Sequence, residues 1–161
     1  AEHYLRFYAA QHGLDFTVLR YGNVYGPRQD PSGEAGVIAI FIAKMLAHQG
    51  VRIDSDGKQT RDYVYVGDIA RANVLALESG SRGAYVLGTN RRTSVNALYG
   101  ELAKILGYDV PIERAPKRAG DVRDAQFDAS LAHRELGWAP EVSLREGMEK
   151  TVAFFRDRLS T

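Results

Sequence analysis

The sequence predicts an α/β fold built on a parallel sheet. Short runs rich in β-branched and aromatic residues, such as residues 15–21 (DFTVLRY) and 83–88 (GAYVLG), indicate strands. Longer segments between them, such as residues 36–49, place apolar residues at the three-to-four-residue spacing of a helix. Because strands alternate with helices at this spacing, a parallel sheet is the arrangement that the pattern favours.

The first two elements are a helix and a strand. Residues 1–12 carry apolar residues at helical spacing and end before Gly13, which suits the left-handed conformation just past a helix end. No capping residue precedes this helix, so we expect it to be the remainder of a longer one. Residues 15–21 predict a strand buried on both faces, followed by a loop crowded with Gly, Pro, Asn, Arg and Asp.

The remaining elements continue the alternation. A largely buried helix closes at Gly50, Asp68 is expected to cap a helix, and Thr93 or Ser94 is expected to cap another. The segments predicted after Gly50 are a strand near residues 51–53, a turn at residues 54–59, a strand and helix over residues 61–79, a strand at 83–88, a helix at 93–108, an extended piece at 111–114, and helices at 128–138 and 143–159.

Composition limits the classes of function. The chain has 161 residues, 45% of them hydrophobic, which suits one domain with one core. Its 21 Lys and Arg nearly balance 20 Asp and Glu, so no overall field draws it to nucleic acid or to a membrane. The absence of cysteine excludes disulfides, thiolate metal sites and a Cys nucleophile. With no membrane-length apolar run and no signal peptide, a soluble cytoplasmic protein is predicted.

The sequence offers no catalytic centre. The four histidines stand at no metal-ligand spacing and form no triad pattern, so we assign neither a metal site nor a catalytic residue. The segment GNVYG follows its strand with the wrong glycine spacing for a dinucleotide fingerprint.

The loop after the first strand is the first candidate binding element. Open α/β sheets bind ligands beyond the carboxyl ends of their strands, where Asn23 and Arg28 would present donors. The alternative is a long surface loop in which Asn23 and Asp30 only cap turns, and residue types alone do not separate the two interpretations.

Two further arginines suggest an anion site. Arg61 precedes the alternating strand DYVYV, and Arg118 lies in a loop three residues before Asp121, which can accept from sugar hydroxyls. Two arginines and an asparagine in one crevice would suit a diphosphate. The alternatives are a surface ion pair of Arg61 with the neighbouring Asp62 or Asp56 and a local salt bridge in the loop around Arg118.

Five blocks in order carry a family resemblance: LRYGNVYGPRQDP, GEAGVIAIF, DGKQTRDYVYVGDIARA, RAGDVRDAQFDASLAHRELGWAP and SLREGMEKTVAFF. Together they resemble the C-terminal half of an extended short-chain dehydrogenase/reductase, closest to the UDP-glucose 4-epimerases among nucleotide-sugar epimerases. The resemblance implies that residues 1–161 are the substrate-binding, C-terminal portion of a Rossmann-type α/β fold. It implies that the end of the catalytic helix and the last strands of the parent sheet are present. The N-terminal NAD-binding half, with its glycine loop and Tyr-x-x-x-Lys pair, would be lacking.

The resemblance also implies residue roles. Asn23, Arg61 and Arg118 match residues that hold the sugar-nucleotide diphosphate, and Asp121 matches the acid that binds the ribose. The other matches are Val37 and Ile38 in the substrate pocket, Tyr21 and Val24 against the nicotinamide, and Asp54 in place of a common Phe near the uracil. The substitution at Asp54 leaves selectivity for the base open.

The implied function is UDP-sugar binding for an NAD-dependent 4-epimerase that interconverts UDP-glucose and UDP-galactose or a close analogue. NAD would be bound mainly by the absent half, so the isolated chain is expected to be inactive. A homodimer or association with that half is expected to cover the apolar surfaces. The alternatives are a related dehydratase or decarboxylase portion and a non-enzymatic sugar-nucleotide-binding or interaction module.

Overall fold

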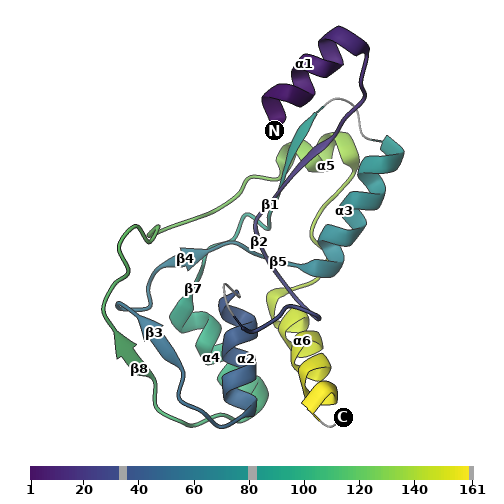
Figure 1. The fold of residues 1–161 in the computed structure, drawn as a ribbon. Coiled ribbons are helices and arrows are strands. Elements are labelled where there is room, and N and C mark those ends of the chain that lie inside the picture. The colour runs from purple at the N-terminus through teal and green to yellow at the C-terminus, as the bar shows by residue number, and fades with distance from the viewer. Residues whose placement is uncertain (33–35, 80–82, 160–161) are drawn as a thin grey trace.

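The computed structural model describes residues 1–32, 36–79 and 83–159; Gly33, Glu34 and Ala35 of the predicted binding loop lie outside the described residues. Figure 1 shows its elements in chain order. They are α1 (Glu2–His12), β1 (Val18–Tyr21), β2 (Asn23–Tyr25), α2 (Val37–Leu46), β3 (Arg52–Asp54), β4 (Thr60–Arg61), β5 (Tyr63–Tyr65), α3 (Val66–Ser79), β6 (Ala84–Leu87), β7 (Thr93–Ser94), α4 (Val95–Leu106), β8 (Glu113–Ala115), α5 (Ser130–Leu136) and α6 (Leu144–Leu159).

The described strands pair two by two. Three pairs are parallel, β1 with β6, β2 with β5 and β3 with β8, while β4 and β7 are antiparallel. The parallel pairing agrees with the sequence, but one continuous sheet does not form. The ladder changes partner at single residues: the Gly22 amide donates to the Leu87 carbonyl at 2.8 Å, and the next amide, of Asn23, donates to the Asp62 carbonyl at 2.9 Å. Gly22 therefore separates β1 from β2, and Asp62 separates β4 from β5.

Two hydrophobic clusters hold the elements together. The first is formed where α2, α4 and α6 pack against one another, and Ile42, Leu98 and Met148 are fully buried in it. The second lies between α3, α5 and the strands β5 and β6, around the fully buried Tyr85 and Trp138. Both clusters follow from the apolar stripes of their helices, which remove nonpolar area from water.

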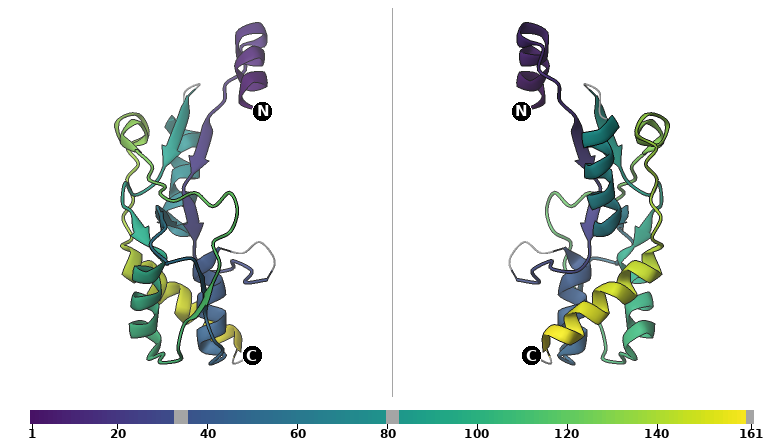
Figure 2. Two further views of the ribbon diagram at one scale, coloured as in Figure 1. Left: turned by 90° about the vertical axis from the view of Figure 1, so that its left-hand side faces the viewer. Right: turned by 90° about the vertical axis from the view of Figure 1, so that its right-hand side faces the viewer.

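The molecule is elongated, with α1 at one end and the C-terminal helix α6 at the other (Figures 1 and 2). α1 has no buried residue, and it ends at Gly13 with a φ of 70°, as the glycine predicts. None of the described helices combines the length and the apolarity needed to cross a membrane.

Some local predictions are confirmed and others are wrong. Ser94 caps α4, because its hydroxyl oxygen accepts from the Ala97 amide at 3.1 Å. β1 is not buried on both faces: Tyr21 is exposed, and the exposed Arg20 forms an ion pair with Glu2 of α1. α2 ends at Leu46 rather than Gly50, because the chain turns there and His48 takes a φ of 50°.

Asp68 does not cap a helix as predicted. It lies inside the first turn of α3, and its carboxylate accepts from the backbone amides of Glu141 and Val142, both at 3.1 Å. The reason is that the chain leading into α6 packs beside this turn and supplies donors that the local sequence does not contain.

Candidate functional site

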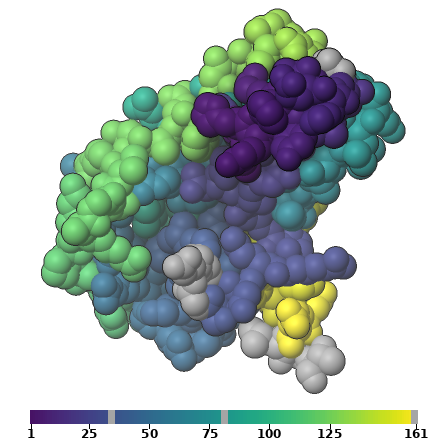
Figure 3. Space-filling view, turned by 45° about the horizontal axis from the view of Figure 1, so that its top comes forward, coloured from purple at the N-terminus to yellow at the C-terminus, as the bar shows by residue number. Residues whose placement is uncertain are grey.

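A pocket of about 680 Å³ lies between β2, α2, β3, β4 and the segment after β8. We call residues 116–126 of that segment the strap; in the space-filling view the chain around it borders one side of the molecule (Figure 3). The pocket is lined by Asn23, Val24, Tyr25, Gln29, Gly36, Val37, Ile38, Ile40, Phe41, Lys44, Arg52, Asp54, Gln59, Arg61, Tyr63, Val95, Arg118 and Asp121.

Eight of the residues singled out from the sequence line this pocket, whereas Tyr21 and Arg28 do not. Those brought together are Asn23, Val24, Val37, Ile38, Asp54, Arg61, Arg118 and Asp121. Tyr21 is outside the lining: its ring is 46% exposed at the end of β1, and its hydroxyl donates to Asn73 Oδ1 at 3.1 Å. The roles of these residues toward a ligand stay predictions.

Strand and helix ends position these side chains. Asn23 opens β2, and its Nδ2 donates to the Asp62 carbonyl oxygen at 3.3 Å, which holds the amide at the pocket wall. Val37 and Ile38 begin α2 directly after Gly36, so the start of this helix faces the pocket. Arg61 ends β4, opposite Thr93 in the antiparallel ladder.

Arg61 is anchored on the strap. Its Nη2 pairs with Asp121 Oδ1 at 2.5 Å, and its Nη1 donates to the carbonyl oxygens of Thr60 at 2.8 Å and Val122 at 2.7 Å. Its partner is therefore neither of the neighbouring aspartates considered from the sequence. Because Arg61 is only 21% exposed, the pair holds a cation at a defined place in the pocket.

Arg118 reaches the pocket from the strap in a looser way. Its Nε lies 2.6 Å from Asp54 Oδ2, while Arg52 Nε lies 3.1 Å from Oδ1 of the same carboxylate. The Arg118 side chain is 75% exposed, so this pair is weak and the guanidinium is free to change partner. Four lining residues are cationic and two are carboxylates, an excess of two positive charges.

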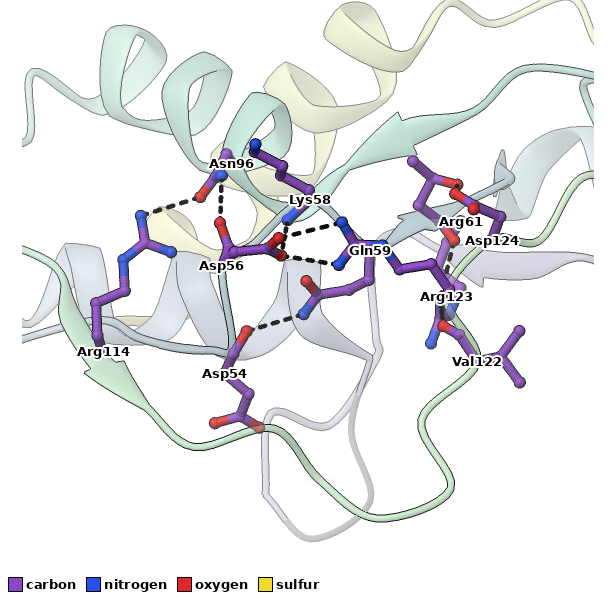
Figure 4. Close-up of polar contacts among 11 residues, drawn as sticks. Asp54, Asp56, Lys58, Gln59, Arg61, Asn96, Arg114, Val122, Arg123 and Asp124 are labelled. Carbon is purple, nitrogen blue, oxygen red and sulfur yellow. Dashed lines mark hydrogen bonds and ion pairs between the residues drawn. The ribbon is translucent and has the colours of Figure 1, made fainter.

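The strap is docked on β4 by contacts outside the pocket (Figure 4). Arg123 forms a two-pronged pair with Asp56, with distances of 2.9 and 3.1 Å, and this guanidinium holds the pKa of the carboxyl well below its usual range. Thr60 donates from its amide to the Arg123 carbonyl at 2.9 Å and from its hydroxyl to Asp124 Oδ1 at 2.6 Å. These contacts hold the outer end of the strap in place.

Besides Tyr25, Lys44 and Arg52, the sequence missed three polar residues of the pocket. Gln29 Oε1, Gln59 Oε1 and the Tyr63 hydroxyl are buried without a hydrogen-bond partner in the part of the chain that the structure describes. Burial raises the pKa of Tyr63 to about 12, which keeps its hydroxyl neutral. A spacing signal existed for two of them, because residues 59, 61 and 63 lie two apart along an extended stretch.

Only part of this surface fits NAD. Val24, in the middle of β2 at the pocket wall, and the exposed Tyr21, at the end of β1, are the two residues predicted to contact the nicotinamide. The chain has no G-x-G-x-x-G segment that would open a helix toward the cofactor's diphosphate. The residues present therefore fit the nicotinamide end of the cofactor.

Comparison with known proteins gives close matches over the whole chain. Residues 1–88 match the family model described as the NAD dependent epimerase/dehydratase family. A putative UDP-glucose 4-epimerase of Methanocaldococcus jannaschii is 42% identical over 99% of this chain and 52% of its own length. The crystal structure of a UDP-glucose 4-epimerase from Thermotoga maritima with UDP-glucose superposes with a TM-score of 0.96, at 52% identity over 98% of this chain and 51% of that one.

A third relative holds the cofactor. The UDP-glucose 4-epimerase of Thermus thermophilus, solved in complex with NAD, superposes with a TM-score of 0.88 at 42% identity, over 96% of this chain and 51% of that one. The matched family is NAD-dependent, which confirms NAD as its cofactor. The chain spans about half the length of the relatives that it matches.

The family match corrects the predicted fold class. It begins at residue 1 and covers more than half of the chain, so these residues carry the pattern of the NAD-dependent family model itself. The prediction of a C-terminal portion that lacks the NAD-binding part is therefore wrong. That prediction depended on the resemblance of five sequence blocks and on the lack of a glycine loop and a Tyr-x-x-x-Lys pair, whereas the match extends over the strands and helices from α1 to β6.

Proposed function

The chain belongs to the NAD dependent epimerase/dehydratase family, and from this we propose that residues 1–161 act as one unit that binds a UDP-sugar in the 680 Å³ pocket. The observation that carries the proposal is the charge of the pocket wall. Lys44, Arg52, Arg61 and Arg118 face only two carboxylates there, which suits the charge of a diphosphate.

Each lining residue has a role in this proposal. Arg61 is 21% exposed and paired with Asp121, so it provides a fixed guanidinium. The exposed Arg118 leaves Asp54 and binds a phosphate oxygen instead. Asn23 donates its second Nδ2 hydrogen to the same group. Asp121 would accept from the ribose, Asp54 would lie near the base, and the sugar would lie against Val37 and Ile38.

We further propose that the parent activity is a 4-epimerization that interconverts UDP-glucose and UDP-galactose or a close analogue. NAD, when bound, supplies the acceptor and donor of a hydride, and Tyr21 and Val24 would lie against its nicotinamide. The residues of this chain bind the diphosphate tightly while the hexose changes its orientation. Binding energy from the diphosphate, remote from the reacting carbon, thereby positions that carbon. The epimerase relatives, at 42 to 52% identity, favour this activity over a dehydratase or decarboxylase.

The test is a calorimetric titration of UDP into the pure chain, compared with Arg61→Ala and Arg118→Ala. We expect Arg118→Ala to weaken UDP binding about tenfold through loss of a charge-assisted hydrogen bond, and Arg61→Ala to weaken it more. Arg61→Ala has the larger effect because Arg61 also anchors the strap. Arg145→Ala is the matched control, since this arginine is 60% exposed on α6, outside the pocket lining, and pairs with Glu101 and Glu149.

Equal UDP binding by all four proteins would contradict the proposed site. Binding that only the two pocket substitutions weaken would support it. The same preparation is assayed for interconversion of UDP-glucose and UDP-galactose. We expect none, because the sequence contains no Tyr-x-x-x-Lys pair, and turnover by the pure chain would contradict that expectation.

A further inference from the structure

Asp62 is a fully buried carboxylate at the single residue that separates β4 from β5. Its oxygens accept four hydrogen bonds: from the Thr89 amide at 2.8 Å, the Thr89 hydroxyl at 2.5 Å, the Asn90 amide at 3.0 Å and the Phe127 amide at 3.1 Å. None of these four donors is a cation. The carboxylate therefore links the loop after β6 and the chain entering α5 to the junction between β4 and β5.

The backbone of Asp62 holds a residue of the pocket. Its carbonyl oxygen accepts from the Asn23 amide at 2.9 Å and from Asn23 Nδ2 at 3.3 Å. A carbonyl oxygen can only accept, so the nitrogen of the Asn23 side chain has to face it. One Nδ2 hydrogen is thereby used at Asp62, and the direction of the other is set toward the pocket that Asn23 lines.

The surroundings leave Asp62 no second position. A Cβ added at Gly88 would lie 2.6 Å from Phe127 Cβ and 3.0 Å from Asp62 Oδ2. One added at Gly22 would lie 3.3 Å from the Asp62 carbonyl oxygen and 3.2 Å from Phe127 Cδ2. Because Gly22 and Gly88 have no side chain, Phe127 and the ends of β1 and β6 pack directly around Asp62. The carboxylate accepts hydrogen bonds from the amides that this packing buries.

We propose that Asp62 is a positioning residue for anion binding: its buried carboxylate fixes the main chain at position 62, and this sets the Asn23 amide and the adjacent Arg61. The proposal rests on the proposed function, because the anion is the diphosphate of that ligand. Asp62 itself is absent from the pocket lining and touches no ligand in this proposal.

The test compares Asp62→Asn with Asp68→Asn. Asparagine at position 62 would turn an N–H group toward amides that also donate, which disturbs the main chain there. Asp68 is the matched control because it is 2% exposed and accepts from Arg71, Glu141 and Val142, all outside the pocket lining. UDP binding is measured by calorimetry at a temperature where circular dichroism reports each variant as folded.

We expect Asp62→Asn to weaken UDP binding about tenfold and Asp68→Asn to leave it unchanged. Because Asp62 acts partly through Asn23, its effect should shrink in a chain that already carries Asn23→Ala. Thr89→Val, which removes one hydrogen bond to the carboxylate, should act in the same direction with a smaller effect, and it replaces Asp62→Asn if that variant does not fold. Unchanged UDP binding, or effects of Asp62→Asn and Asn23→Ala that simply add, would overturn the proposal.

A second readout separates this proposal from the function on which it rests. If UDP does not bind the unmodified chain, the proposed function fails, and the position of Asn23 is then read from its side-chain amide resonances by nuclear magnetic resonance. These resonances should move in Asp62→Asn and not in Asp68→Asn. Unmoved resonances in Asp62→Asn would show that the carboxylate does not position Asn23.

Discussion

Charged residues in this chain pair across long distances in the sequence. Sequence considerations offered Asp56 and Asp62 as neighbours of Arg61, but Arg61 binds Asp121, Asp56 binds Arg123, and Asp62 accepts only uncharged donors. The Asp56–Arg123 pair joins residues 67 apart. The roles of acids and bases near the pocket therefore depend on where the strap docks.

The Asp56–Arg123 pair predicts a pH dependence of stability. Arg123 lowers the pKa of Asp56 in the folded chain, so the stabilisation is present above the usual Asp pKa near 4 and is lost as the pH falls below it. Asp56→Asn should lower the melting temperature at pH 7 by no more than about 3 °C, since the pair is exposed. Its melting temperature should also fall less steeply below about pH 4.

Melting curves of the unmodified chain and of Asp56→Asn between pH 7 and pH 2 would check this, with Arg123→Gln as the partner control. The two variants should behave alike, because each removes the same pair. An unchanged slope below about pH 4 in both variants would contradict the assignment.

At the scale of elements, the parallel direction of the strands and the helix caps follow from local sequence, whereas the partner of each strand does not. The glycine at the end of α1 and the serine at the start of α4 act as predicted. The division of the strands was only partly predicted: the first strand was expected to end before Gly22, but residues 23–25 were expected in a loop and form β2, and Asp62 lies in a run that looks like one strand. Phe127 packs closely against Gly22 and Gly88, the residues that directly follow β1 and β6.

The cap of α4 gives a prediction about a single element. Ser94→Ala removes the acceptor of the Ala97 amide and should destabilise the chain by about 1 kcal/mol in urea unfolding. Thr93→Ala is the control, since the sequence did not distinguish the two residues as caps and the structure places the cap at Ser94. A larger loss for Thr93→Ala than for Ser94→Ala would contradict this assignment.

At the scale of the whole molecule, α1 stands out because none of its residues is buried against the rest of the chain. It projects from one end (Figure 2) and exposes Tyr4 by 72%, Phe7 by 56% and Tyr8 by 49%. Three exposed aromatic rings on one helix are costly in water and typical of an interface. We therefore expect a second copy of the chain to cover this helix in solution, which is one of the two associations predicted from the sequence.

Light scattering tests this expectation. The chain should have the mass of two copies at micromolar concentration, and the combined Tyr4→Ser and Phe7→Ser substitutions should shift it toward one copy. Val122→Ser, at a residue 57% exposed on the strap, is the control and should leave the mass unchanged. A single-copy mass for the unmodified chain would contradict the prediction.

Much of the site could be predicted because its residues are charged or lie in glycine-rich turns. Asn23, Arg61, Arg118 and Asp121 were chosen from residue type and resemblance, and they do line one pocket. Gln29, Gln59 and Tyr63 were missed because a neutral polar side chain has no charge that separates it from a surface or core residue, and the two-residue spacing of Gln59 and Tyr63 from Arg61 does not by itself indicate a pocket. Only their burial without partners distinguishes them.

The sequence by itself determined the alternation of strands and helices, most of their ends, and eight of the residues that gather at the pocket. These depend on interactions within a few residues, which local patterns encode. The tertiary structure alone decided which strands pair at Gly22 and Asp62, which acid each arginine binds, and where the strap lies. Those contacts join residues far apart in the sequence, 39 apart for Asn23 and Asp62 and 60 apart for Arg61 and Asp121, so no local pattern encodes them.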